Sequence, residues 1–509
     1  MAIGQKIGDR PLVALALQRI GLTYVLGNNY PKALENYTQV LEIRRSLGDR
    51  ARVAFTLVNI AGIYSSLGEK QQALDTYNMA LTLQTVKDRP REAVSLNNIV
   101  LVYSSLGDYQ QSINSHNSAL AIFRSIGDRV QEGQTLDYIA SIYRLSGDYR
   151  KALDYYNQAL AVTRASGDRF RKLASLTGVI RAYEALKDYP KALETANTTL
   201  TIARTLNSPF AEATALALTG RVYLASGDYP KALDASSAAL KTWQQLGIRV
   251  AAAPTLDNIG KTYNAQANYP SAIASYNEVA VWRSLGAKAD EAESLYNIAV
   301  SERARGNIPQ AQTQIKAAIA LVETLRTKIA SKDLRATYFA SVQKYYEFYT
   351  DLLMQWHKRE PKAGYDAEAL EVSDRARARS LLEILTEANA DIRKGIDPQL
   401  LTKERNLQTK LDVAETWRVN VLSANPTPTQ AAAVDKQVSE LLKQYQDLQA
   451  QIRTTSPQYA ALTQPQSLKL AQIQKLLDPN TVLLEYSLGE KRSYLWAITA
   501  KSLTTAILD

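Results

Sequence analysis

The eight residues SGDYRKAL, Ser146–Leu153, recur along the chain with little change and decide how it folds. Close copies lie 39 or 40 residues apart, as LGEKQQAL, LGDYQQSI, LKDYPKAL and SGDYPKAL. The small residue near the end of each copy, together with its counterparts in diverged copies, anchors eight units, at Ala33, Ala73, Ser112, Ala152, Ala192, Ala232, Ala272 and Ala311. A fixed period of this length predicts a stack of similar structural units.

Each unit carries two apolar patterns that are typical of helices. Before the turn of the second unit, apolar residues fall at i, i+3, i+4 and i+7, which places them on one helix face: Leu57, Ile60, Ala61 and Tyr64. A second pattern of the same kind follows the turn, from Ala73 to Leu81. Each unit is therefore predicted to be a helical hairpin, with a first helix A and a second helix B.

Turn residues separate these helices. Gly147 and Gly227 can adopt the left-handed conformation that ends a helix, and Pro230 suits the first turn of the next one. Between units, the tripeptide Gly-Asp-Arg repeats this logic, because its aspartate can cap the following helix. It occurs at Gly48, Gly127 and Gly167. Since one hairpin cannot bury its apolar face alone, consecutive hairpins are expected to stack into a solenoid.

The order of Leu, a small residue and Tyr, then Ala, an aromatic residue and Ala or Val, resembles the tetratricopeptide repeat over about Pro11–Ala318. That family's usual period is ~34 residues, and the longer period here resembles its kinesin light chain variety. The resemblance implies an all-α fold, a right-handed superhelical solenoid of about eight 40-residue helical hairpins. Residues 3–10 resemble residues 43–50, so we expect the chain to begin inside a repeat.

Five segments are predicted along the chain. Residues 1–10 are the remnant of a preceding repeat, 11–318 the solenoid, and 319–395 irregular closing helices. Residues 396–455 form a coiled-coil-like helical hairpin, because Val434, Val438, Leu441, Tyr445, Leu448 and Ile452 alternate spacings of four and three. Residues 456–509 then contain a connector, a brief helix near Leu470–Leu477, and strands.

The strands are predicted in LLEYSLGEKRSYLWAITAKSLTTAILD, Leu483–Asp509, where β-branched and aromatic residues lie on either side of a turn at Gly489–Arg492. Two or three strands alone are marginal in water and expose unpaired edges. We therefore expect this sheet to need partners.

The C-terminal third carries a second resemblance. YFASVQKYYEFYTDLLMQ, RARARSLLEIL, SPQYAALTQPQSL and LLEYSLGEKRSYLWAIT, in this order, are similar to the lead-in to a CHAT domain, a caspase-like fold, over about Asp333–Asp509. The resemblance implies that the strands are the first edge of an incomplete α/β caspase-like domain, with the chain truncated inside it. The family's catalytic histidine and cysteine lie further along, and no residue of this sequence corresponds to either.

Composition excludes or disfavours several classes of function. The sequence has no cysteine, which excludes disulfides, thiolate metal sites and a cysteine nucleophile within these residues. No apolar run approaches the ~18 residues that a membrane helix needs, and the N-terminus lacks a secretory signal, so a cytoplasmic location with no membrane contact is expected. The net charge of +10 is mild and interleaved with acidic residues, which disfavours a nucleic-acid-binding solenoid.

Helix A offers the candidate binding residues. In the resembling family this helix lines the concave surface, where Arg181, Arg221 and Lys261 would form a basic strip, with Arg144 and Arg303 one turn later. Asparagines next to the first groove position resemble those that hold a peptide backbone in kinesin light chain type arrays, at Asn59, Asn98, Asn258 and Asn297. The alternative is that Asp257 pairs with Lys261 at i, i+4 and that the asparagines bond neighbouring turns.

Other candidates are better explained by structure. His116 replaces a tyrosine of other units and is expected in the core, and His357 has no acidic cluster at ligand spacing. Asp290, Glu291 and Glu293 open a helix, where acids favour the dipole. Three arginines alternate along one helix and are expected to fan out into solvent, at Arg375, Arg377 and Arg379.

These observations predict a scaffold that recognises an extended protein segment, suited to acidic side chains, and regulates an attached caspase-like domain. The chain itself is expected to have no enzymatic activity, cofactor or metal. One alternative is the regulatory half of a cysteine protease that is active only in the full-length protein, and another is a nucleic-acid-binding solenoid. The partner's identity and the oligomeric state stay open.

Overall fold

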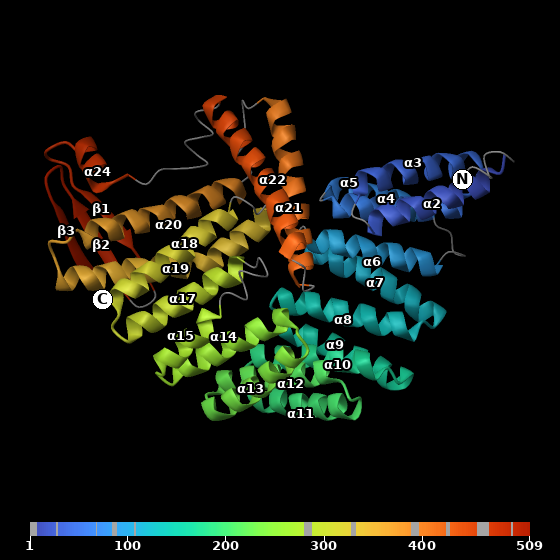
Figure 1. The fold of residues 1–509 in the computed structure, drawn as a ribbon, viewed down its shortest axis with the longest axis horizontal. Coiled ribbons are helices and arrows are strands. Elements are labelled where there is room, and N and C mark those ends of the chain that lie inside the picture. Colours follow the sequence, from blue (N-terminus) through green and yellow to red (C-terminus); the bar gives the residue numbers. More distant parts are fainter. Residues whose placement is uncertain are drawn as a thin grey trace. The chain divides into compact units, whose positions relative to one another are not determined.

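A computed structural model describes residues 8–26, 29–67, 69–83, 89–105, 108–278, 288–326, 332–387, 397–423, 428–455, 468–489 and 492–508. These residues form helices followed by one small sheet (Figure 1). The chain divides into two compact units, Met1–Ile248 and Arg249–Asp509, each of which is described separately.

The described residues of unit 1 form six helical hairpins, and the two helices of each hairpin pack against one another. In chain order the helices are α2 (Arg10–Leu26), α3 (Tyr30–Ser46), α4 (Arg50–Ser66), α5 (Lys70–Leu83), α6 (Arg89–Ser105), α7 (Tyr109–Ile126), α8 (Arg129–Leu145), α9 (Tyr149–Ser166), α10 (Arg169–Ala185), α11 (Tyr189–Thr205), α12 (Pro209–Ser226) and α13 (Tyr229–Gln245). Even-numbered helices are the predicted helices A and odd-numbered ones the helices B.

The helix ends follow the predicted turn chemistry. Asp49, Asp128 and Asp168 are N-cap residues whose side chains accept hydrogen bonds from backbone N–H groups three residues on. Each satisfies a donor that the first helical turn leaves unpaired. Gly147 and Gly227 have φ of 83° and 84°, the left-handed region that glycine adopts without steric cost. The predicted stops and starts of these helices are therefore confirmed.

Small anchors allow the helices to approach closely. Ala33, Ala73, Ala152, Ala192 and Ala232 are fully buried, as is Ser112 in the third hairpin. Next to them, Tyr37, Tyr77 and Tyr156 fill the space between hairpins. The apolar core consists of separate clusters that join neighbouring hairpins, the expected organisation of a repeat stack.

Unit 2 contains two further hairpins, α14 (Arg249–Ala265) with α15 (Tyr269–Asn277) and α17 (Lys288–Ala304) with α18 (Ile308–Arg326). Two longer helices follow, α19 (Lys332–Arg359) and α20 (Tyr365–Glu387), and then the pair α21 (Pro398–Ser423) and α22 (Pro428–Thr455). Short elements close the chain: α24 (Leu470–Leu476), β1 (Leu483–Ser487), β2 (Ser493–Ile498) and β3 (Leu503–Leu508).

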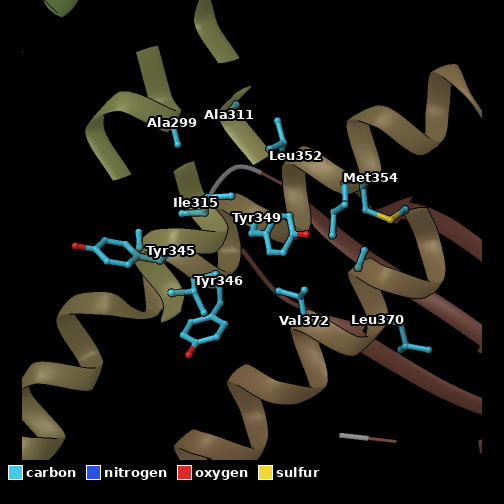
Figure 2. Packing of buried hydrophobic residues seen from close by; sticks show 14 of the residues in the cluster. Ala299, Ala311, Ile315, Tyr345, Tyr346, Tyr349, Leu352, Met354, Leu370 and Val372 are labelled. Carbon is cyan, nitrogen blue, oxygen red and sulfur yellow. The ribbon is translucent and has the colours of Figure 1, made fainter. Parts of the chain in front are cut away.

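The largest apolar cluster of unit 2 joins α17, α18, α19 and α20 with the sheet. Figure 2 shows Tyr345, Tyr346 and Tyr349 of α19 beside Ile315 of α18 and Val372 of α20. Trp496 and Ile498 of β2 belong to the same cluster and are fully buried. The sheet is therefore packed on helices and does not stand alone.

The three strands are antiparallel in the order β1-β2-β3. Along β2 every second residue is buried, Tyr494, Trp496 and Ile498, because successive side chains of a strand point to opposite faces. Glu485 is paired with Trp496 in the register, and its carboxylate forms an ion pair with Arg377 of α20.

Arg377 is exposed, as the solvent-facing interpretation expects, but it is also ion-paired with the sheet. Its guanidinium also donates to the backbone oxygen of Tyr486, 3.3 Å away. A charged group with two acceptors on β1 holds the sheet against α20, which helical spacing could not reveal. The side chain of Arg379 lies outside the described residues.

The predicted helices and strands of the C-terminal third are confirmed within the described residues. Along the predicted coiled-coil seam, Val434, Val438, Leu448 and Ile452 are buried. The connector SPQYAALTQPQSL, apart from its last residue, and residues 1–7 lie outside the described residues. The caspase-like fold and the five segment boundaries stay predictions, and the division between the units falls inside the predicted array of residues 11–318.

Candidate functional site

An open hollow lies between α8 and α10 in unit 1, with a volume of ≈ 400 Å³. Two of the predicted binding residues line it, Arg144 near the end of α8 and Arg181 in α10. Neither guanidinium makes an ion pair or hydrogen bond with any residue that the structure describes. Partial desolvation, then the like charges of Arg221 and Arg144, lower the pKa of Arg181, which nonetheless stays a cation at neutral pH.

Asp137 forms an acidic corner of the same hollow. Its Oδ1 accepts a hydrogen bond from Ser175 at 2.6 Å, whereas its buried Oδ2 accepts none from the described part of the chain. Burial raises the pKa of Asp137 to about 6, although the Ser175 hydrogen bond and the charge of Arg171 oppose the shift. The hollow thus presents two cations without an acceptor among the described residues, Arg144 and Arg181, and a third, Arg171, that is paired with Asp168.

Gly178 and Tyr156 shape the floor of this hollow. A Cβ at Gly178 would lie 2.2 Å from the ring of Tyr156, so only glycine lets this ring approach α10 so closely. The Tyr156 hydroxyl lies 3.0 Å from the Ser141 hydroxyl, which fixes the ring. The absence of a side chain at 178 interrupts the predicted asparagine series and at the same time makes room for the hollow.

The other predicted cations are paired inside the protein. In unit 1, Arg221 forms an ion pair with Glu184 of the preceding hairpin, with a second contact from Nε at 2.9 Å. In unit 2, the ammonium of Lys261 lies 2.7 Å from Asp257, the pair that the alternative interpretation foresees.

Arg303 is also paired within unit 2. It forms an ion pair with Asp351 of α19 and donates to Gln355 at 3.0 Å. Its guanidinium also lies over the ring of Phe348, 5.3 Å from the centroid. These contacts satisfy Arg303 without a ligand.

The four predicted asparagines divide in the same way. Asn297 donates to Asp257 at 3.1 Å. Asn59, Asn98 and Asn258 are half-buried, and their side chains have no hydrogen-bond partner among the described residues. Their amides are available to another molecule, as the prediction requires.

Sequence reasoning missed Asp137, Arg171 and Gln134 as lining residues of the hollow. Asp137 occupies the groove position immediately before Tyr138, so the repeat period could have predicted that it lies on the groove face. That its Oδ2 is buried without a partner depends on the packing of α8 on α10 and had no signal in the sequence.

A polar cluster around Asp351 connects the last repeat with the sheet in unit 2. Its carboxylate contacts Arg303 of α17 and the hydroxyl of Tyr494 in β2, and lies 3.5 Å from Arg492. Burial opposes ionisation of Asp351, but the Tyr494 hydrogen bond and the charge of Arg303 outweigh it and lower its pKa. One carboxylate therefore bridges a predicted binding residue and the sheet.

The residues judged structural have partners inside the protein. His116 is buried, stacks on Tyr138 and lies 3.2 Å from Asn97. Burial lowers its pKa to about 4, so it is neutral at pH 7. Glu293 is held by Lys344 and Tyr345, each at 2.9 Å. His357 lies 3.6 Å from Asp366.

The described residues contain no group of three or more His, Asp or Glu side chains placed to hold a metal ion. None of the described helices is both long and apolar enough to cross a bilayer.

A family model described as "Tetratricopeptide repeat" matches residues 12–85, 91–165, 172–245 and 213–280, together more than half of the chain. Among curated proteins, Photosystem I assembly protein Ycf3 of Prochlorococcus marinus (strain MIT 9303) is 41% identical over 75 residues, which are 15% of this chain and 42% of that protein. The corresponding protein of Synechococcus elongatus is 40% identical over 70 residues, 14% of this chain and 39% of its own. The chain thus spans about two fifths of the length of these relatives.

Two solved structures are similar to this chain at low identity. A signal transduction ATPase with a tetratricopeptide repeat sensor from Pyrococcus horikoshii is 16% identical, with a TM-score of 0.46, over 71% of this chain and 53% of that one. A Rap protein complexed with competence and sporulation factor is 13% identical, with a TM-score of 0.43, over 72% and 99% of the two chains.

Proposed function

Because the chain belongs to the tetratricopeptide repeat family, we propose that it is a scaffold that binds an extended segment of a partner protein at the hollow between α8 and α10. Stacked helical repeats present extended surfaces of this kind. A role in assembly, the one named for the Ycf3 relatives, is one that such a surface would serve.

One observation carries the proposal. Arg144 and Arg181 line one hollow and have no partner among the described residues, whereas Arg221, Lys261 and Arg303 already have internal acceptors. Unpaired cations at a solvent-open hollow attract acidic side chains, and charge complementarity guides and orients such a partner. The segment that fits is therefore acidic at this point.

The neighbouring polar groups would hold the backbone of the segment. The unpaired amides of Asn59 and Asn98 can bond peptide groups further along unit 1. In unit 1, Arg221 would join only by exchanging its internal partner for the ligand, which makes it a weaker contact. In unit 2, considered by itself, Asn258 is a candidate for bonding a peptide group, whereas Lys261, Arg303 and Asn297 would first have to leave an internal partner.

We propose further that binding regulates a caspase-like domain to which β1–β3 would belong, as the resemblance of the C-terminal third implies. The bridge from Arg303 through Asp351 to Tyr494 supports a route between the last repeat and the sheet. With no cysteine in the sequence, this chain is expected to cleave no peptide by thiol chemistry. The cytoplasmic location rests on the sequence alone.

The test compares two double variants with equal charge change. Arg144→Glu/Arg181→Glu reverses the lining cations, and Arg150→Glu/Arg169→Glu reverses two exposed cations that do not line the hollow. Binding of fluorescent 15-residue peptides carrying zero, two or four aspartates is measured by anisotropy. Each charge-assisted contact is worth ~1.5–3 kcal/mol, so the affinity of the first variant for the tetra-aspartate peptide should fall by well over tenfold.

The control variant should bind the tetra-aspartate peptide nearly as the unaltered chain does, and added salt should weaken binding in both. Equal losses in the two variants would show that the net charge of the chain, and not the hollow, attracts the peptide. Tighter binding of a duplex or single-stranded oligonucleotide than of any peptide would favour the nucleic-acid alternative.

A further inference from the structure

The helix A face that lines the hollow continues toward the N-terminus of unit 1 with different chemistry. Gln134, Ser141, Ala174 and Arg181 line the hollow from positions 18 and 11 residues before their anchor alanines. Five of the six corresponding positions in the first three hairpins hold large apolar side chains, here called the apolar row: Leu15, Leu22, Phe55, Val94 and Leu101.

The residues of the apolar row are exposed. Leu15 is 48% exposed, Val94 50% and Leu101 67%, and Leu22 and Phe55 are 42% and 40% exposed. A single exposed apolar side chain is ordinary, but five exposed apolar side chains in one register of α2, α4 and α6 are a pattern that marks an interaction site. In the fourth to sixth hairpins, these positions hold Gln134, Ser141, Ala174, Arg181, Thr214 and Arg221.

The apolar row has a spacing that an extended peptide can follow. The helices α4 and α6, which carry Phe55 and Leu101, contact one another directly. Adjacent packed helices lie about 8–10 Å apart, and three residues of extended chain span about 10 Å. A peptide running across the helices therefore meets a new helix about every third residue. Gly62 holds the remaining position of the row and leaves room for a larger ligand side chain there.

Charge distinguishes the two ends of this surface. The apolar row covers the first three hairpins, and the unpaired Arg144 and Arg181 follow in the fourth and fifth. Tyr138, 46% exposed, lies between them on α8. A ligand that satisfies both parts must be apolar along one stretch and acidic along the next.

We infer that the partner segment carries apolar side chains at about every third residue over the apolar row and acidic side chains over Arg144 and Arg181. This inference rests on the proposed function and adds the chemistry and the order of the ligand's residues. The occupant is a segment of another protein. A second copy of this chain and a nucleic acid are outcomes of the test.

Three synthetic peptides, each made in both chain directions, test the inference with the full chain. The complete peptide has Leu at three positions spaced by three, then Asp at the next two such positions. The acidic peptide replaces Leu with Ser, and the apolar peptide replaces Asp with Asn. By fluorescence anisotropy, the complete peptide should bind at least tenfold more tightly than either of the others in one of its directions.

Variants of the apolar row provide the second measurement. Phe55→Ser/Leu101→Ser should lower the affinity for the complete peptide about tenfold and leave the affinity for the acidic peptide unchanged. The matched control is Val130→Ser/Phe170→Ser, which removes two exposed apolar side chains outside the row and should change neither affinity. Circular dichroism of all variants confirms that the repeats remain folded.

The outcomes separate the two proposals. Equal affinity for the complete and acidic peptides would refute the apolar row while the proposed function stands. Equal affinity for the complete and apolar peptides would refute the acidic end. If no peptide binds, both proposals are refuted. Self-association of the chain that Phe55→Ser/Leu101→Ser abolishes would assign the row to a second copy and overturn the inference.

Discussion

Asp257 holds Lys261 across one turn of α14, with its carboxylate oxygen 2.7 Å from the ammonium nitrogen. The same carboxylate accepts a hydrogen bond from Asn297 of α17. Two residues that the sequence placed in a ligand-binding surface are thus held by one internal acid. The hydrogen bond from Asn297 to Asp257 joins successive hairpins, whereas the Lys261 ion pair lies within α14.

Replacing Lys261 and replacing Asp257 should lower the stability of the chain by unequal amounts. Lys261 is half-exposed, so Lys261→Met should lower the free energy of unfolding by at most ~1 kcal/mol. Asp257→Ala removes the acceptor of Asn297 and the nearer of the two acids beside Lys261, the other being Glu293 at 4.0 Å, and should cost ~1–3 kcal/mol. Thermal melts followed by circular dichroism would compare them. An Asp257→Ala variant as stable as the unaltered chain would show that the pair is dispensable.

Asp137 should make the stability of unit 1 depend on pH. Burial raises its folded pKa to about 6, so the fold favours the protonated acid. This contribution is fully present below the ordinary pKa of about 3.8 and is lost as the pH rises through about 6. Asp137→Asn mimics the protonated form at every pH. Its melting temperature minus that of the unaltered chain should therefore increase from pH 4 to pH 7.5.

The control for this measurement is Asp154→Asn, which alters an exposed carboxylate of α9. The melting temperature of Asp154→Asn minus that of the unaltered chain should stay nearly constant from pH 4 to pH 7.5. If the melting-temperature difference for Asp137→Asn did not change with pH, water or another group would satisfy Oδ2 and the acid would be ionised in the fold.

Ala267 occupies a backbone conformation that suits glycine. Its φ is +59°, at the turn where Gly147 and Gly227 have φ of +83° and +84° in other hairpins. A side chain in this region costs roughly 1–2 kcal/mol, part of which glycine loses again through its freer unfolded state. Ala267→Gly should therefore raise the free energy of unfolding by ~0.5–1 kcal/mol.

A matched substitution lies two residues earlier. Ala265 is the last residue of α14, and Ala265→Gly should destabilise the chain by up to ~1 kcal/mol because glycine is a poor helix former. Chemical denaturation should show that the free energy of unfolding rises in Ala267→Gly and falls in Ala265→Gly. The same sign in both would contradict the conformational argument.

Asp351 should control the stability of the sheet. Asp351→Asn removes the charge that holds Arg303 and Arg492 and weakens the acceptor of the Tyr494 hydroxyl. Amide hydrogen exchange of β1, β2 and β3 should accelerate several-fold, while α8–α11 should exchange as before, because local openings are governed by local contacts. Asp447→Asn, at an exposed position of α22, serves as the control. Unchanged exchange in the sheet would show that its apolar face alone holds it.

The repeats, the hairpins and their caps could be predicted because they depend on residues close in sequence. Gly127 and Asp128 end one helix and begin the next within two residues, and the period of Ala152 and Ala192 identifies the repeat. Such signals are local, since helical spacing and capping involve residues at most four apart. The composition likewise excluded a cysteine nucleophile before any fold was known.

Which cations are available to a ligand was decided only by the tertiary structure. Arg221 meets Glu184, 37 residues away, Arg303 meets Asp351, 48 away, and Arg377 meets Glu485 at the start of the sheet. The hollow beside Arg144 and Arg181 likewise exists because Gly178 lets Tyr156 approach α10. Ion pairing falls off steeply with distance, and the distance between side chains of different helices is set by packing, which no spacing along the chain records.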